Sequence, residues 1–369
     1  MEVGNRTENI TDGITFHFYP HSVIISTVYI IIIFVGILGN ALVIVGVFVT
    51  PKLRTPTNVL LVNLAIADLL TCLALPFQTI GVLSPPNEFP LPLFVCSIIG
   101  GVIYVTFTCS AVNLLLIAII RYYVITRSLR SSHGLNTRKI QAVFAVLAWI
   151  LAVVYVMVPI HVFHLTEFSY YPGYRQCFTS PTDTIDIYHN YLAVLLGIHL
   201  LIIMCCYTRI VFFVKQHQKR FRVVFGSSCD AQGKRYRDEI RRLSKREVRV
   251  TKNLFTVVLA FVVCALPTVV SFLLPGVLVA GLYTTAILYC NNCINPILYA
   301  FKHPVFKKAF MRFIKRLLPA PTKSEKSTCA TTGVLAHSVQ TACASALNAS
   351  YLGTMDVTIT GSLEVLDLL

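Results

Sequence analysis

The stretch VIISTVYIIIIFVGILGNALVIVGVFV at residues 23–49 decides the fold, because it contains no charged side chain. A helix needs about 20 mostly apolar residues to cross the hydrocarbon core of a membrane, so this stretch is long enough to span one. Six further apolar runs follow, at residues 58–83, 93–126, 140–163, 188–214, 251–275 and 278–301. The sequence therefore predicts an all-α membrane protein, a bundle of seven transmembrane helices.

The composition of the whole chain favours lipid as its surroundings. Of its 369 residues 56% are hydrophobic and only 13% are charged, whereas soluble domains carry about 25% charged residues. The net charge of +15 could suggest a nucleic-acid partner. Such binding needs basic residues that share one face, but here they fall in short blocks between apolar runs. We therefore expect no nucleic acid to bind.

The positions of the 31 lysines and arginines predict the orientation of the chain. All except Arg6 and Arg175 lie in, or next to, connections on one side of a seven-span arrangement. Because positively charged loops stay in the cytosol, the N-terminus is expected outside the cell and the C-terminus inside, in a multi-pass protein of the plasma membrane. An even number of spans would break this alternation of charge.

The segments outside the spans carry their own signals. The polar N-terminus lacks a signal-peptide pattern and contains two sequons, which make Asn5 and Asn9 expected glycosylation sites. After the last span, basic and apolar residues alternate with helical spacing, which predicts an amphipathic eighth helix on the inner membrane surface, in contact with lipid. The Ser/Thr-rich remainder lacks periodicity and is expected to be disordered. The predicted regions are an extracellular N-terminus (1–22), a transmembrane domain (23–301), a membrane-surface helix (302–318) and a cytoplasmic tail (319–369).

Few polar groups interrupt the spans, and such groups often mark function. Asp68 is the one acid inside a span, and two interpretations of it stay open: hydrogen bonding between helices, or a hydrated pocket that holds a cation. Arg121 ends the third span and could pair with Glu247 at the start of the sixth. Pro267 and Pro296 can each kink a helix, which suits a bundle with two packing arrangements.

Chemical motifs of enzymes are missing from the sequence. There is no HExxH zinc motif, no GxSxG nucleophile motif and no glycine-rich phosphate loop. His161 and His164 are expected at the edge of the membrane rather than as metal ligands. The sequence therefore predicts that this chain is not an enzyme and has no cofactor, with a sodium ion as the one possible exception.

Several short motifs occur in one order along the predicted spans. They are Gly39-Asn40, the LAxAD pattern at Leu64–Asp68, Cys96 upstream of Arg121, Trp149, Cys177 between spans four and five, and NPILY at Asn295–Tyr299. In this order, from residue 23 to 318, the chain resembles the rhodopsin-like (class A) family of G-protein-coupled receptors. The resemblance implies a heterotrimeric G protein and an extracellular ligand as partners, and arrestin and receptor kinases acting on the Ser/Thr-rich tail.

The resemblance also implies roles for individual residues. It pairs Cys96 with Cys177 in a disulfide, consistent with an oxidising exterior. The sodium site would comprise Asp68, Ser110, Asn291 and Asn295. Activation and G-protein coupling would involve Arg121, Tyr122, Glu247, Tyr207, Tyr299, Asn295 and Pro296. The ligand pocket would be lined by Gln78, Ile103, Tyr104, Phe107, Tyr191, Thr268, Phe272, Thr285 and Tyr289.

At several positions the sequence departs from the family pattern. Ile120 replaces the acid before the arginine, so that Glu247 alone is expected to restrain Arg121. Ala265 stands where a tryptophan is usual, and His199 where a proline is usual, so ligand coupling must use other packing.

Two further positions bear on the ligand. Ile103 replaces the aspartate that binds amines, and Tyr289 replaces the lysine that binds retinal. Because the expected pocket is apolar and aromatic without an acid, a neutral small molecule or the tip of a peptide is the expected ligand.

Two alternatives to a signalling receptor stay open at this point. A transporter or channel would usually show internal repeats or several charges inside the membrane, and neither is visible. A receptor-shaped protein that no longer couples normally, or that is constitutively active, would explain Ile120 and Ala265.

Overall fold

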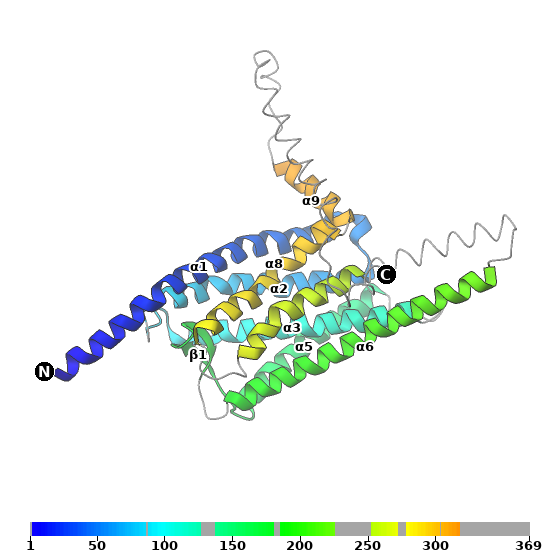
Figure 1. Cartoon of the computed structure of the whole chain (residues 1–369). Coiled ribbons are helices and arrows are strands. Elements are labelled where there is room, and N and C mark those ends of the chain that lie inside the picture. Colours follow the sequence, from blue (N-terminus) through cyan, green and yellow to red (C-terminus); the bar gives the residue numbers. More distant parts are fainter. Residues whose placement is uncertain are drawn as a thin grey trace, which may run out of the picture. The chain divides into compact units, whose positions relative to one another are not determined.

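The computed structural model describes residues 2–85, 88–126, 137–180, 185–225, 252–271, 278–302 and 304–317, the side chains near several segment ends excepted. Its elements are mostly long helices (Figure 1). They are α1 (Glu2–Val49), the short 3-10 helix η1 (Pro51–Leu53), α2 (Pro56–Leu83), α3 (Leu93–Thr126), α5 (Arg138–His161), α6 (Ile185–Phe225), an unlabelled helical stretch at 252–271, α8 (Leu278–Lys302) and α9 (Pro304–Leu317). Strands β1 (Phe168–Tyr171) and β2 (Gln176–Thr179) form the one sheet among these residues.

The helices reproduce the predicted spans. Six of them, within α1, α2, α3, α5, α6 and residues 252–271, are long and apolar enough to cross a membrane. The seventh is α8, whose middle carries Asn291, Asn292 and Asn295 and is therefore less hydrophobic. The predicted seven-helix membrane fold is thus confirmed. The bounds differ most at two places: α1 begins at Glu2 rather than at 23, and α6 extends to Phe225 rather than ending at 214.

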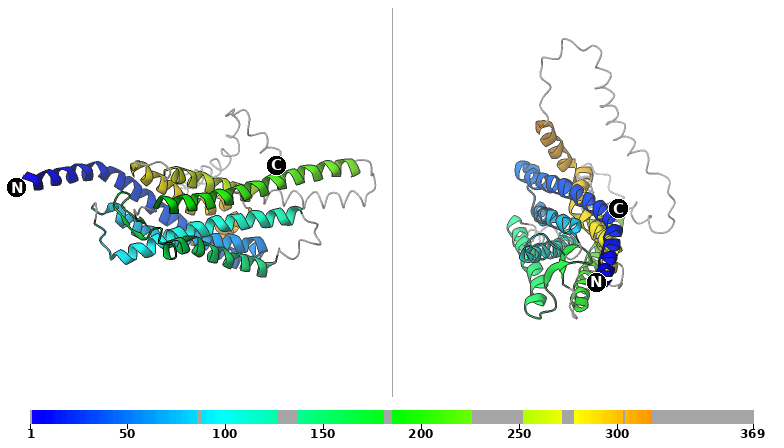
Figure 2. Two further views of the ribbon diagram at one scale, coloured as in Figure 1. Left: turned by 90° about the horizontal axis from the view of Figure 1, so that it is seen from below. Right: turned by 90° about the vertical axis from the view of Figure 1, so that its left-hand side faces the viewer.

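Helix α3 is the central element of the bundle. It contacts α2, α5, α6 and both strands, while α1 packs against α2 and α8, and the end-on view shows the helices clustered side by side (Figure 2). Glycines allow two of these approaches. A Cβ atom on Gly39 would lie 2.8 Å from Cβ of Pro296, and one on Gly36 would lie 2.3 Å from Sγ of Cys72. Small residues at such crossings are typical of helices that pack in membranes.

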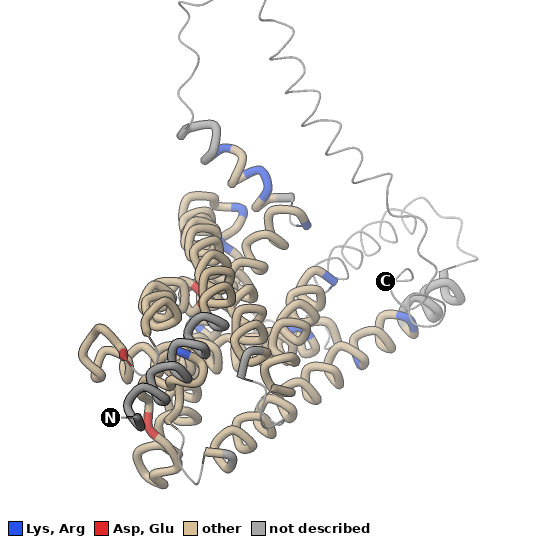
Figure 3. The backbone as a smooth tube through the Cα atoms, turned by 60° about the vertical axis from the view of Figure 1, so that its left-hand side comes forward, with Lys and Arg blue, Asp and Glu red and all other residues tan. Residues whose placement is uncertain are grey.

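The outer surface of the bundle is apolar. Phe34 is 67% exposed, Phe212 67% and Leu201 65%, and few charged residues lie along the described helices (Figure 3). A soluble protein rarely exposes a continuous apolar surface of this kind. The exposed side chains therefore face lipid, as the composition predicts.

A β-hairpin lies between α5 and α6, a feature absent from the all-α prediction. The strands are antiparallel, with Tyr170 opposite Cys177. Pro172 and Gly173 lie in the connection, and Arg175 at its end adopts a left-handed backbone with a φ of 49°. This Pro-Gly pair between two aromatic-rich runs is typical of a hairpin connection.

The predicted amphipathic eighth helix is confirmed as α9. The ring of Phe306 is fully buried and stacks on Tyr299 with ring centroids 5.6 Å apart, while Lys307 and Lys308 are exposed. Residues up to Phe310 belong to the same compact unit as the bundle. The predicted tail at 319–369 lies outside the described residues.

Candidate functional site

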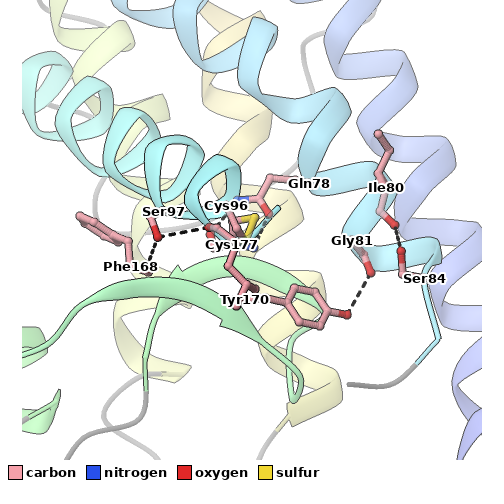
Figure 4. The surroundings of a disulfide bond; sticks show 10 residues. Gln78, Ile80, Gly81, Ser84, Cys96, Ser97, Phe168, Tyr170 and Cys177 are labelled. Atoms are coloured by element: carbon pink, nitrogen blue, oxygen red, sulfur yellow. Dashed lines mark hydrogen bonds between the residues drawn. A yellow bond between two sulfur atoms is a disulfide. The ribbon is translucent and has the colours of Figure 1, made fainter. Parts of the chain in front are cut away.

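The β-hairpin covers one end of the bundle, and a disulfide and several hydrogen bonds attach it there (Figure 4). Cys96 at the start of α3 forms a disulfide with Cys177 of β2, which confirms the predicted pair. Ser97 donates from Oγ to the carbonyl oxygen of Phe168 at 2.5 Å. Tyr170 donates from its hydroxyl to the carbonyl oxygen of Gly81 at 3.3 Å. Burial raises the pKa of Tyr170, which keeps this phenol neutral and able to donate.

Gln78 corrects one predicted role. The resemblance predicts it in the ligand pocket, but its side chain is fully buried against β2. Its Nε2 donates to the carbonyl oxygen of Cys177 at 2.8 Å, and its Oε1 accepts from the amide of the same residue at 2.7 Å. Gln78 therefore positions the strand that carries the disulfide, and it does not line the cavity described next.

A cavity of about 110 Å³ lies below the hairpin, enclosed by α3, α5, α6, residues 252–271 and α8. Six of the predicted pocket residues line it: Ile103, Tyr104, Phe107, Thr268, Thr285 and Tyr289. Tyr191 does not, although its neighbours His189 and Leu192 on α6 do, and Phe272 lies outside the described residues. The cavity is also lined by residues that the sequence analysis did not assign to it, among them Phe178, His189, His199, Ala111 and Ala265.

Polar groups gather at the hairpin end of this cavity. The hydroxyl of Thr179 in β2 lies 3.0 Å from Nε2 of His189 and 3.4 Å from the hydroxyl of Tyr104. Strand β2 thus contributes to the cavity wall. This contact could not be predicted from the sequence, because it depends on how the loop folds back over the helices.

Small side chains form the opposite end of the cavity. Ala111 of α3 and Ala265 face it there, together with His199 of α6. Next to them the rings of Phe107 and Phe261 stack with centroids 5.3 Å apart and an interplanar angle of 17°. This aromatic pair occupies the region where the sequence lacks the usual tryptophan.

Two of the polar residues predicted around Asp68, Ser110 and Asn295, contact it. Asp68 is fully buried; its Oδ1 accepts from Oγ of Ser110 at 3.5 Å and its Oδ2 from Nδ2 of Asn295 at 2.9 Å. Asn291 is also buried, and its Oδ1 has no hydrogen-bond partner among the described residues. One carboxylate, one hydroxyl and one side-chain amide therefore share one buried site between α2, α3 and α8.

At the end of α3 opposite the hairpin, Arg121 is 7% exposed and donates from Nη2 to Oγ1 of Thr57 on α2 at 2.8 Å. Arg121 thus has a neutral partner on α2. Glu247, the restraint that the sequence predicts, lies outside the described residues. The hydroxyls of Tyr207 and Tyr299 are buried without a hydrogen-bond partner in the described part of the chain.

The other residues named for activation have distinct places. Ile120 is buried in the core, whereas Tyr122 is 37% exposed. Pro296 packs against Gly39. The side chains of Asn5 and Asn9, near the start of α1, are not described.

Comparison with known proteins decides the family. The family model of the 7 transmembrane receptor (rhodopsin family) matches residues 39–299. The chain belongs to this family.

Relatives and solved structures agree with this assignment. Somatostatin receptor type 5 of Rattus norvegicus is 29% identical over 311 residues, which cover 79% of this receptor and 78% of the relative. The crystal structure of squid rhodopsin shares the fold with a TM-score of 0.69 at 22% identity, covering 82% of this receptor and 86% of that chain. These relatives are signalling receptors rather than enzymes, and membership of the family also rejects the transporter or channel alternative.

Proposed function

We propose that this receptor lies in the plasma membrane, binds an extracellular ligand in the cavity below the hairpin, and activates heterotrimeric G proteins. One observation carries the proposal: the central helix α3 lines the cavity and also carries Arg121. Ala111, at the end of the cavity, and Arg121 are ten residues apart, which is about 15 Å along a helix. A ligand that moves α3 therefore acts directly on the position of the arginine.

The proposed orientation places the hairpin end outside the cell. A disulfide persists in an oxidising exterior, and Cys96–Cys177 lies at this end. The basic residues support the same orientation, since α9 begins at the opposite end of α8 and carries Lys307 and Lys308. In this arrangement α9 lies on inner-leaflet lipid, and arrestin and receptor kinases would reach the tail at 319–369.

The residues around Asp68 fit a sodium ion as an allosteric ligand. A buried carboxylate is costly unless it is paired or coordinates a cation, and Na⁺ would add charge to a site that otherwise offers neutral groups. Ser110 supplies a hydroxyl oxygen, and the unpartnered Oδ1 of Asn291 supplies a second oxygen. Asn295 would take part by turning its amide so that its oxygen faces the ion.

The ligand we propose is neutral. No Lys, Arg, Asp or Glu is among the residues that line the cavity in the described part of the chain, so a charged ligand would lose its hydration without gaining a partner. The name of the rat relative, a somatostatin receptor, supports a peptide as one source of the bound group. A small molecule of similar chemistry is the other source.

Nucleotide exchange tests the proposed function. Membranes with the receptor should increase GTPγS binding to at least one class of purified heterotrimer, and Arg121→Ala should remove the increase at equal surface expression. Thr126→Ala serves as a control, because Thr126 lies on the same helix and its side chain bonds only to the carbonyl of Tyr122. If wild type and Arg121→Ala gave equal exchange with every class, without ligand and across a panel of peptides and small molecules, coupling would be disproved and the receptor-shaped alternative favoured.

A further inference from the structure

The end of the cavity farthest from the hairpin forms a recess, and one of its walls carries a histidine among small and aliphatic side chains. Ala111, Ala265 and Leu195 present small or aliphatic groups, and His199 presents an imidazole. His189 and His199 are ten residues apart on α6, so the recess lies about 15 Å deeper along that helix than the polar groups beside Thr179. Two histidines therefore mark the two ends of one elongated cavity.

The two histidines differ in their partners. His189 contacts the hydroxyl of Thr179, so the structure already uses one of its ring nitrogens. His199 is 8% exposed, and its ring lies 6.0 Å from the ring of Tyr155 at a tilt of 44°. Throughout the described chain, no hydrogen bond to the His199 ring is formed. Burying a polar group without a hydrogen-bond partner costs free energy. Because His199 lines the cavity, a molecule that fills the cavity can supply that partner.

The chemistry of the recess selects the partner. A neutral imidazole offers one N–H donor and one acceptor nitrogen, and a hydroxyl can use either. The adjacent walls are aromatic, since Phe107, Tyr155 and Tyr289 all line the cavity, and such rings favour an aromatic neighbour. A dry cavity on the order of 150 Å³ holds a benzene ring, so the cavity as a whole, at about 110 Å³, has room for no more than one ring.

We propose that this recess is a subsite for a phenol group and that His199 recognises its hydroxyl. The inference rests on the proposed function in one respect, namely that the cavity takes the ligand. Two sources supply the same chemistry: a free phenolic molecule, or the side chain of a tyrosine in a peptide whose end enters the cavity. Ala111 and Ala265 make the subsite possible, because a larger side chain at either position would fill it.

Paired probes test the proposal on the purified, full-length receptor. Dissociation constants are measured from the rise in thermal stability with 4-ethylphenol and ethylbenzene, and with N-acetyl-tyrosinamide and N-acetyl-phenylalaninamide. One hydrogen bond corresponds to a preference of about three- to tenfold for the hydroxylated member of a pair. A preference in the first pair alone assigns the subsite to free phenols, in the second alone to a peptide side chain, and in both to either source.

Variants locate the preference. His199→Phe should abolish it, His199→Gln should restore part of it because an amide also donates and accepts, and Ala265→Phe should exclude every probe. Gly197→Ala is the matched control on α6, since a Cβ there meets nothing within 4 Å; it should bind as wild type does. Equal affinity for both members of each pair in wild type, or an unchanged preference in His199→Phe, would overturn the proposal and leave His199 as a packing residue.

If His199→Phe does not fold, the affinities of the paired probes for the wild-type receptor and for His199→Gln still test the proposal. None of these measurements uses a G protein. A receptor that bound phenols but did not stimulate nucleotide exchange would refute the proposed function and leave the subsite intact, and the reverse result would do the opposite.

Discussion

The side chain of Gln78 forms two hydrogen bonds with the backbone of Cys177, one as donor at 2.8 Å and one as acceptor at 2.7 Å. Both residues are buried, so Gln78→Met would leave an amide and a carbonyl without partners. Each such group costs about 1–3 kcal/mol. We expect the purified receptor to unfold several degrees lower, measured by thermal denaturation, whereas Gln216→Met, at an exposed site on α6, should leave the midpoint unchanged.

The disulfide and Gln78 are expected to act on the same strand. Cys96→Ser with Cys177→Ser opens a link across 81 residues of sequence, and loss of a native disulfide typically costs about 2–5 kcal/mol. Because both attachments position β2, Gln78→Met should lower the free energy of unfolding by less in the variant without the disulfide than in the wild type. A double-mutant cycle measures this coupling. Strictly additive losses would show that the two attachments stabilise the receptor independently.

The helices and the polar residues inside the bundle could be predicted from the sequence. Continuous apolar runs define the spans because the hydrocarbon core requires them. Asp68 was recognisable as a functional centre because a lone acid inside a span is rare, and Ser110 and Asn295 do contact it. These predictions depend on local composition and on spacing along single helices.

The contacts between the loop and the bundle could not be predicted in the same way. Gln78 was assigned to the pocket from its position on its helix, but its partner is backbone, which carries no sequence signal. Tyr191 was also assigned to the pocket, but the next residue, Leu192, lines the cavity in its place. His199 stands where a proline is usual in the family, and only the packing of α3, α6 and residues 252–271 shows that it faces a cavity.

Sodium is expected to stabilise the receptor through Asp68. If the ion binds there, the unfolding free energy rises by about 0.4 kcal/mol when its concentration equals Kd, and by about 1.4 kcal/mol in total at ten times Kd. Asp68→Asn should remove this dependence, and Ser110→Ala should only weaken it. Thermal unfolding is followed against NaCl, with KCl at equal ionic strength as the control. An identical NaCl dependence in wild type and Asp68→Asn would exclude the site.

The last prediction concerns activity without ligand. Arg121 lacks an acid beside it in sequence, because that position is Ile120, and its guanidinium donates instead to Thr57 on α2. A hydrogen bond to a charged group contributes about 1.5–3 kcal/mol, and 1.4 kcal/mol is a factor of ten in population. If the contact with Thr57 restrains the inactive state, Thr57→Val should raise ligand-free GTPγS exchange severalfold, and Ile120→Asp should lower it by adding a closer partner.

The comparison needs a matched substitution and equal surface expression. Thr71→Val changes the same residue type on α2, where the threonine contacts Thr106 at 2.7 Å rather than Arg121, so it should leave basal exchange unchanged. Glu247→Ala should raise exchange further if that acid is a second restraint, since removing two independent restraints has additive effects on free energy. Suppose instead that Arg121→Ala abolishes exchange while Thr57→Val and Ile120→Asp both match wild type. The arginine would then be needed for coupling, but its contact with α2 would not set the equilibrium between the two states, and the packing of Phe107 on Phe261 would be the next restraint to test.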